Sequence, residues 1–341
     1  MFETNLRDYF PIFSKPSQSL PWVYFDSAAT SQKPASVLET MQTFYTKNNA
    51  NVHRGSHTVS LATTQAFEKA RQTIQHFIHA ASYKEIIWTK GATESINLVA
   101  AILAKARLRA GDEIVLSNLE HHANIVPWQQ VAEQLGLVIK VLPISQNGVL
   151  DLERSLALIT DKTALLAVAH VSNALGNIQP IEQLIEKAKE CGALTLIDGA
   201  QAVAHLDVDV QALDCDFYVF SGHKMFGPTG IGVLYGKQAL LEVLPAYQTG
   251  GEMIKKVSFT GSTFQGLPFK YEAGTPNIAG VLGIAAAADF IKLHRINIAK
   301  QELFLYQLLI AGLQQIPELQ LWGEIDNSIC LQSFTVEGID N

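Results

Sequence analysis

Short apolar segments alternate with longer stretches of helical pattern along most of this chain, and that alternation restricts its fold more than any other feature. The apolar runs that predict strands cover residues 85–89, 113–117, 165–171, 194–197, 217–220 and 232–235. The helical patterns cover residues 93–108, 127–135 and 181–190, the last followed by Gly192. Strands separated by helical segments of about 10–15 residues are typical of βαβ units. The pattern therefore predicts an α/β fold built on a mostly parallel sheet.

The character of the sequence changes after about Gly261. A Gly/Ala-rich helix is expected at 277–291, a longer amphipathic helix at 298–313 and a strand at 328–336. From this change we predict two domains, a large one over residues 17–262 and a smaller α+β domain over residues 1–16 and 263–341. The N-terminal stretch before Pro21 is expected to pack on the smaller domain. The strand at 328–336 is expected to lack its partners, because the sequence stops soon after it.

Composition and charge exclude several classes of partner. Apolar residues make up 48% of the 341 residues, which is typical of a globular protein with a large core. The formal charge is 25 − 32 = −7, and an acidic chain without Lys/Arg runs disfavours nucleic acid and anionic membranes. No apolar run approaches the roughly 20 residues of a membrane span, and the N-terminus lacks a secretory signal pattern. Three cysteines without a CxxC pair favour a reducing, cytoplasmic location over a disulfide framework or a zinc site.

Polar residues follow several of the predicted strands, and in an open parallel sheet ligands bind at the carboxyl ends of the strands. Ala92 and Thr93 open the helix after the first strand, where backbone N–H groups can hold a phosphate, although an ordinary turn and cap explain the same residues. His121 follows the second strand and could stack on an aromatic cofactor. Asp198 ends the fourth strand; it could cap a helix, or hold a proton on a heterocyclic nitrogen.

A lysine in an unusual place adds to these clusters. Lys224 comes directly after the strand at 217–220, beside Gly222 and His223, whereas most lysines lie on solvated surfaces. An amine held out of water near a cationic histidine has a lowered pKa, which suits Schiff-base chemistry. Each cluster alone is weak support for a ligand site. Their common position at strand ends, in sequence order, predicts one site.

The ordered motifs GATESIN, EHHAN, HVSN, DGAQ, SGHKMFGPTGIG and EAGTPN resemble those of class V aminotransferases, which have the fold of type I pyridoxal 5′-phosphate (PLP) enzymes. The segments DSAAT (26–30), NVHRGSHT (51–58), EHHANIVPW (120–128) and DVQALDCDFYVFSGHK (209–224) narrow the resemblance to group II cysteine desulfurases and selenocysteine lyases. The resemblance runs from about Tyr24 to Asn341. It implies an aspartate aminotransferase-like large domain with a mostly parallel seven-stranded sheet, and a small domain without its C-terminal part.

The resemblance also implies PLP as the cofactor and assigns roles around it. Lys224 matches the lysine that forms the Schiff base and moves the substrate proton, and His121 matches the imidazole stacked on the ring, which also assists proton transfer. Asp198 matches the partner of the pyridinium nitrogen, and Gln201 the donor to the phenolic oxygen. The implied phosphate positions are Ala92, Thr93, Ser221 and His223.

Further residues match positions outside this inner set. Gly251 and Thr275 match positions that reach the cofactor of a neighbouring subunit, which implies a homodimer. Asn173, His53 and Arg54 match substrate positions. The resemblance implies no metal.

The implied reaction removes sulfur from L-cysteine, or selenium from L-selenocysteine, and gives L-alanine and an enzyme persulfide. The persulfide would serve a sulfur-acceptor protein in iron–sulfur cluster assembly or other sulfur transfer. The family's nucleophilic cysteine lies in an R-x-G-x-H-C context that these 341 residues lack. We therefore expect Cys191, Cys215 and Cys330 to be structural. If the molecule ends at Asn341, PLP binding should survive while desulfuration fails; with a C-terminal extension the protein should be a complete desulfurase.

Three other interpretations remain open at this point. A related class V lyase or aminotransferase, kynureninase-like or an epimerase, would share the cofactor site. A non-catalytic PLP-binding fragment would keep the cofactor and lose turnover. A metal hydrolase is the third, with ligands drawn from the set His53, His57, His121, His122 and Asp198, although it leaves Lys224 unexplained.

Overall fold

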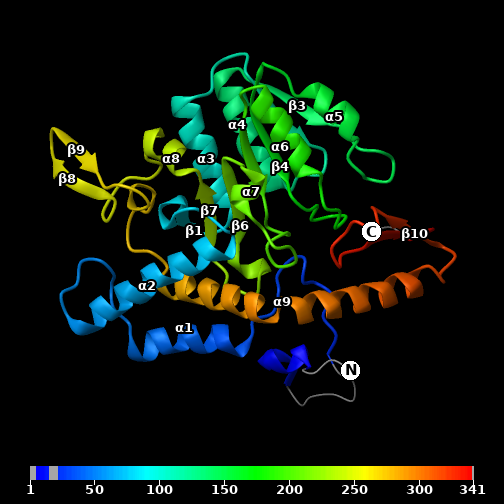
Figure 1. Ribbon diagram of the computed structural model, residues 1–341, viewed down its shortest axis with the longest axis horizontal. Helices are drawn as coiled ribbons and strands as arrows, with labels where there is room; N and C mark the ends of the chain where they lie inside the picture. Colours follow the sequence, from blue (N-terminus) through cyan, green and yellow to red (C-terminus); the bar gives the residue numbers. More distant parts are fainter. Residues whose placement is uncertain (1–4, 15–21, 340–341) are drawn as a thin grey trace.

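A central sheet organises the chain in the computed structural model, which describes residues 5–14 and 22–339. Within these ranges the sheet has seven strands in the order β1-β7-β6-β5-β4-β2-β3 (Figure 1). The strands are β1 (Ile86–Thr89), β2 (Glu113–Ser117), β3 (Val138–Leu142), β4 (Thr163–Ala169), β5 (Leu194–Asp198), β6 (Phe217–Ser221) and β7 (Gly232–Gly236). Neighbours from β3 to β6 are parallel, whereas β7 is antiparallel to both β6 and β1. The predicted α/β fold with a mostly parallel seven-stranded sheet is confirmed.

Helices and two small hairpins surround the sheet. The α-helices are α1 (Ala35–Lys47), α2 (Thr58–Phe77), α3 (Ala92–Ala106), α4 (Val126–Leu135), α5 (Leu152–Leu158), α6 (Ile181–Glu190), α7 (Val210–Leu213), α8 (Gln238–Val243) and α9 (Ile278–Leu313). Short 3-10 turns cover Leu6–Tyr9, Pro11–Ser14, Tyr83–Glu85, His122–Asn124, Gly222–Lys224 and Phe269–Tyr271. The hairpins pair β8 (Ile254–Ser258) with β9 (Gly261–Phe264), and β10 (Leu319–Trp322) with β11 (Ser333–Val336).

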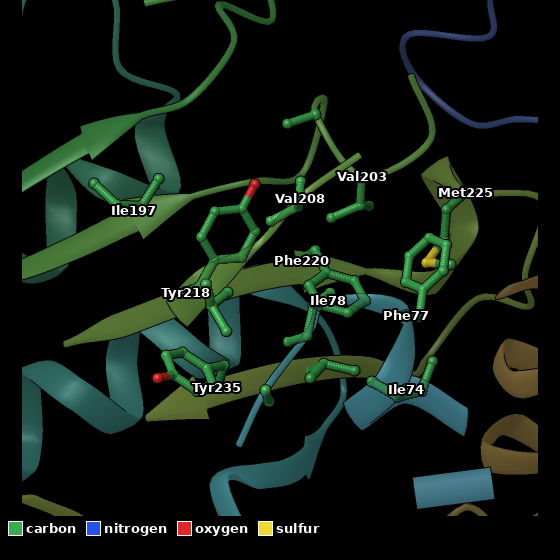
Figure 2. Close-up of a cluster of buried hydrophobic side chains, with 14 of the residues drawn as sticks. Ile74, Phe77, Ile78, Ile197, Val203, Val208, Tyr218, Phe220, Met225 and Tyr235 are labelled. Atoms are coloured by element: carbon green, nitrogen blue, oxygen red, sulfur yellow. The ribbon is translucent and has the colours of Figure 1, made fainter. Parts of the chain in front are cut away.

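Both faces of the sheet are covered, because neighbouring strand residues point to opposite sides. Phe217 and Val219 of β6 lie in a cluster with α3 and α4, whereas Tyr218 and Phe220 lie in a second cluster with α2, α6 and α9. Figure 2 shows part of the second cluster, where side chains of α2, β5, β6 and β7 meet. Burying one such aromatic or branched side chain stabilises the fold by roughly 1.5–3 kcal/mol. A fully buried sheet explains why its strands appear in the sequence as continuous apolar runs.

The C-terminal part departs from the sequence prediction in two ways. The expected helices at 277–291 and 298–313 are one helix, α9, which runs horizontally below the sheet and above α1 in Figure 1. The polar stretch between them, KLHRIN, contains no Gly or Pro and therefore nothing that ends a helix. The predicted strand at 328–336 begins only at Ser333, and it pairs antiparallel with β10. The expectation that this strand lacks a partner is wrong.

The described N-terminal residues pack on α9, as predicted, although they form 3-10 turns. The ring centroids of Tyr9 and Phe10 lie 5.6 and 5.8 Å from that of Phe290 in α9. Phe10 also lies 5.7 Å from Phe226, two residues after Lys224. The rest of the stretch before Pro21, including the proposed domain boundary at residue 17, lies outside the described residues, so that boundary stays a prediction.

Candidate functional site

The end of β6 and the start of α3 meet across the antiparallel strand β7. The register pairs Gly232 of β7 with Ser221 of β6 on one side and with Thr89 of β1 on the other. A Cβ atom at position 232 would lie 2.4 Å from the Cα atom of Gly91, so only glycine permits this approach. The amide of Ala92 consequently donates a hydrogen bond to Ser221 Oγ at 2.8 Å. The first turn of α3 is thereby fixed beside the carboxyl end of β6.

A cavity of about 420 Å³ opens at this edge of the sheet. Its lining comes from the ends of β4, β5 and β6, from the first turn of α3, and from the segments at His121 and Ala28: Ala28, Ala29, Ala92, Thr93, His121, Ala123, Ala169, Val171, Asn173, Asp198, Ala200, Gln201, Ser221, His223 and Lys224. The structure therefore brings together every sequence-predicted position from Ala92 to Lys224, and Asn173 with them. Small side chains form much of the wall and leave room for a flat group.

Lys224 and Asp198 carry opposite charges and lie in the same cavity, largely shielded from solvent. Asp198 is 6% exposed and its carboxylate accepts a hydrogen bond from the amide of Ala200 at 2.9 Å. Burial raises the pKa of Asp198, while the Ala200 amide, Lys224 and His121 act in the opposite direction. Burial lowers the pKa of Lys224, and Asp198 opposes that shift. A larger share of Lys224 is therefore the neutral amine at neutral pH than for a lysine in water.

Two histidines at the cavity share the same electrostatic surroundings. Burial lowers the pKa of His121, and the Lys224 ammonium lowers it further. Burial also lowers the pKa of His223, with Lys224 and Lys33 adding to the effect. His121 Nδ1 accepts a hydrogen bond from the amide of Ala123 at 3.1 Å, which places the proton of a neutral ring on Nε2. Both rings are therefore mostly neutral at pH 7.

The N-terminal segment 27–33 contacts the loop that carries Lys224. The sequence analysis did not predict this contact. The carbonyl of His223 accepts from the amide of Ser31 at 2.9 Å and from the ammonium of Lys33 at 3.2 Å. Gln201 Nε2 donates to the carbonyl of Ala28 at 2.9 Å. The motif DSAAT indicated the family, but nothing in its residue types predicts that segment 27–33 packs against the cavity.

The predicted residues that do not line this cavity, within the described chain, lie together elsewhere. The amide of Gly274, next to Thr275, donates to the carbonyl of Gly251 at 3.0 Å. Arg54 Nε lies 3.0 Å from Oε1 of Glu252, the residue after Gly251. These contacts form a patch that includes Arg54, Gly251 and Thr275.

A network of ion pairs, partly exposed at His53 and buried at Arg71, extends this patch to His53. Its Nε2 lies 2.9 Å from Glu68, which also bonds Arg71 of α2. Arg71 is fully buried and holds Glu272 with two hydrogen bonds, of 2.6 and 2.9 Å. Glu272 precedes Thr275 by three residues, so one network connects α2 with the predicted interface segment.

In the metal-hydrolase alternative, His121 and Asp198 line the Lys224 cavity, whereas His53 and His57 have other partners. His57 caps α2, accepting from the amide of Ser60 at 3.3 Å, while His53 pairs with Glu68. Among the described residues, no group of three or more His, Cys, Asp or Glu side chains is arranged to hold a metal. No helix in the described ranges is long and apolar enough to cross a membrane.

Comparisons with known proteins agree with this geometry. The family model of class V aminotransferases matches residues 23–341. A probable cysteine desulfurase of Vibrio cholerae is 47% identical over 98% of this chain and 83% of its own length. The cysteine desulfurase structures from Thermococcus onnurineus and Escherichia coli (CsdA) superpose with TM-scores of 0.89 and 0.85. They are 39% and 41% identical, and each match covers 93% of this chain and 79% of the other. The chain therefore belongs to the class V aminotransferase family, and within it to the cysteine desulfurases.

PLP is the cofactor of this family, and the cavity fits it. The buried carboxylate of Asp198 and the partly buried amine of Lys224 line the same cavity. The first turn of α3, at Ala92 and Thr93, adds the N-terminus of a helix, which attracts phosphate. The cavity thus contains the three kinds of group that the ring nitrogen, the aldehyde and the phosphate of PLP require.

Proposed function

We propose that this chain acts on L-cysteine, or L-selenocysteine, through residues of the Lys224 cavity. In the reaction the C–S bond breaks, sulfur passes to a thiolate to give a persulfide, and the carbon keeps the electron pair and takes a proton. The product is L-alanine. The observation that supports this proposal is the convergence of Lys224, Asp198 and His121 on one cavity in a chain of the desulfurase family.

The residues of the cavity divide the work of binding and proton transfer. When bound, PLP supplies an electron sink for negative charge on the substrate α-carbon. Lys224 is assigned to covalent attachment and to moving the α-proton, for which its lowered pKa is suited. Asp198 holds the proton on the ring nitrogen, and a cation at that nitrogen favours the ionised carboxylate. His121 is assigned to the face of the ring and to proton transfer at the substrate.

The remaining predicted contacts complete the cofactor site. Ala92, Thr93, Ser221 and His223 are assigned to the phosphate, and Gln201 to the phenolic oxygen. The hydrogen bond from Gln201 to the carbonyl of Ala28 orients the side-chain amide of Gln201 toward the N-terminal segment 27–33. Asn173 is assigned to the substrate.

We also propose a homodimer, in which the patch with His53, Arg54, Gly251 and Thr275 faces the cavity of the second copy. The clustering of these four residues away from Lys224 supports this assignment. Sedimentation at micromolar concentration tests it, and a monomer with full PLP occupancy would contradict it. A sulfur-acceptor protein is the proposed partner, and the three free cysteines support a cytoplasmic location.

None of the three cysteines, all in the described part, lines the Lys224 cavity. Burial raises the pKa of the Cys215 thiol to about 12, which leaves it a poor nucleophile. We therefore expect these three cysteines to be structural, and the Lys224 cavity to bind PLP and to exchange the α-hydrogen of an amino acid. Stoichiometric persulfide on one of these cysteines with repeated turnover would overturn that expectation.

The deciding experiment uses Lys224→Ala and Asp198→Ala beside the parent chain. Each protein is incubated with PLP, treated with borohydride and analysed by mass, and exchange of the L-alanine α-hydrogen in D₂O is followed by NMR. Lys224→Ala should lose the reducible PLP adduct, and Asp198→Ala should keep it but lose exchange by orders of magnitude. An unchanged adduct in Lys224→Ala, or near-parent exchange in Asp198→Ala, would refute the assignment.

A further inference from the structure

A buried carboxylate lies directly behind the His121 segment and has no role in the site described so far. Glu120 is 8% exposed and follows β2 after a short turn. Its side chain accepts three hydrogen bonds: from Ser117 Oγ at 2.5 Å, from Asn124 Nδ2 at 2.6 Å and from the amide of Ala169 at 3.0 Å. Such a buried carboxylate is costly unless its surroundings are built to receive it.

The three donors are themselves fixed in direction. Ser117 Oγ accepts from the amide of Leu119 at 3.1 Å, so its proton is free to point at Glu120. Asn124 Oδ1 accepts from the indole N–H of Trp128 at 2.9 Å, so the amide NH₂ of Asn124 must face Glu120. The site therefore requires an acceptor on both oxygens, which a carboxylate supplies and an amide does not.

These bonds connect the two sides of the Lys224 cavity. His121 is the next residue after Glu120 and lines the cavity from one side. Ala169 ends β4, lines the cavity, and is paired in register with Asp198 of β5. The bond from Ala169 to Glu120 therefore joins the His121 segment to the strand next to Asp198.

We propose that Glu120 is a positioning residue, which fixes the imidazole of His121 relative to Asp198 for proton transfer at the substrate carbon. This proposal rests on the proposed function of the Lys224 cavity. Burial raises the pKa of Glu120 to about 7, with Asp198 contributing in the same direction, while the three donors act to lower that pKa. A displacement of about 1 Å in an active site can cost roughly a hundred-fold in rate.

The test replaces the carboxylate by an amide of the same shape. Glu120→Gln puts an NH₂ group against a donor, so the His121 segment should shift. The matched control is Glu113→Gln at the other end of β2, where the partly buried carboxylate pairs with Lys140 at 3.6 Å and does not line the cavity. All three proteins are loaded with PLP and compared by visible circular dichroism, by PLP affinity and by exchange of the L-alanine α-hydrogen in D₂O.

Glu120→Gln should change the visible circular dichroism of bound PLP and slow exchange by about ten- to a hundred-fold, with PLP affinity within about three-fold of the parent. Glu113→Gln should match the parent in all three measurements. Equal behaviour of the two variants would overturn the proposal, whereas a parent without PLP binding or exchange would instead refute the function of the cavity. If Glu120→Gln does not fold, Ser117→Ala removes one donor and must shift the dichroism and the exchange rate in the same direction, or the proposal fails.

Discussion

Replacing Arg71 by methionine tests how much the buried ion pair of α2 contributes to stability. The guanidinium is fully buried and contacts Glu272, Glu68 and the carbonyl of Ile86, the last at 2.9 Å. Arg71→Met keeps most of the aliphatic volume but leaves the Glu272 carboxylate, whose side chain is 9% exposed, without its cation. Removing one partner of a buried pair typically costs about 3–5 kcal/mol, because the remaining charge stays desolvated.

The assay is urea unfolding of the PLP-loaded protein, followed by far-UV circular dichroism. The urea midpoint should fall in Arg71→Met by the lost free energy divided by the slope m. The matched control is Lys187→Met, which removes a pair with Glu190 at 3.3 Å on the exposed side of α6. A surface pair of this kind contributes about 0–1 kcal/mol, so the control midpoint should hardly move.

A second variant separates the lost charge from lost packing. Glu272→Gln in the Arg71→Met background removes the unpaired charge. It keeps an acceptor for the backbone amide of Trp88, which in the parent protein donates to Glu272 at 2.9 Å. The double variant should therefore be more stable than Arg71→Met alone. A midpoint for Arg71→Met no lower than that of Lys187→Met, or a double variant that is less stable still, would refute this reasoning.

Three further predictions follow from contacts at and below the cavity. Gly232→Ala forces a Cβ atom to within 2.4 Å of the Gly91 backbone, so it should cost at least about 1–3 kcal/mol in urea unfolding and weaken PLP binding measured by absorbance titration. Burial lowers the pKa of His170 to about 4, below its unfolded value of about 6.5. The stability that the neutral ring contributes is present above pH 6.5 and is lost as pH falls toward 4. In urea unfolding at a series of pH values, the free energy of unfolding of His170→Gln should therefore fall less steeply on acidification than that of the parent, by up to about 1.4 kcal/mol per pH unit. Lys33→Met removes a cation that lowers the pKa of His223, so NMR titration should find that pKa raised; an unchanged value would contradict the assignment.

The sheet could be predicted from the sequence because it is buried on both faces. The run FYVFS of β6 is apolar without interruption except at its last residue, and all five residues are buried. The outer strand β3 is half-exposed, and its sequence VIKVL gave no comparable signal. The break predicted within α9 failed because polar residues do not end a helix that continues beyond the core.

The inner site could be predicted for a related reason. Strand ends place Asp198, Ser221 and Lys224 at one edge of a parallel sheet, so local order along the chain becomes proximity in space. The patch at Thr275 and the bond from Ala169 to Glu120 could not be found this way. They depend on ion pairs and hydrogen bonds between segments far apart in the sequence, such as Arg71 with Glu272.

The position of β7 has a consequence for how the chain is made. The edge strand β1 is synthesised first among the strands of the sheet, yet its only partner in the described sheet is β7, roughly 140 residues later. At about 5–20 residues per second, a ribosome needs ~7–30 s after it has made β1 to reach Gly232. Throughout that interval the apolar edge IIWT and the first turn of α3 have no strand to lie against. Nascent chains are therefore exposed to wrong edge pairing until β7 emerges, and a chaperone that shields this segment should raise the yield of folded protein.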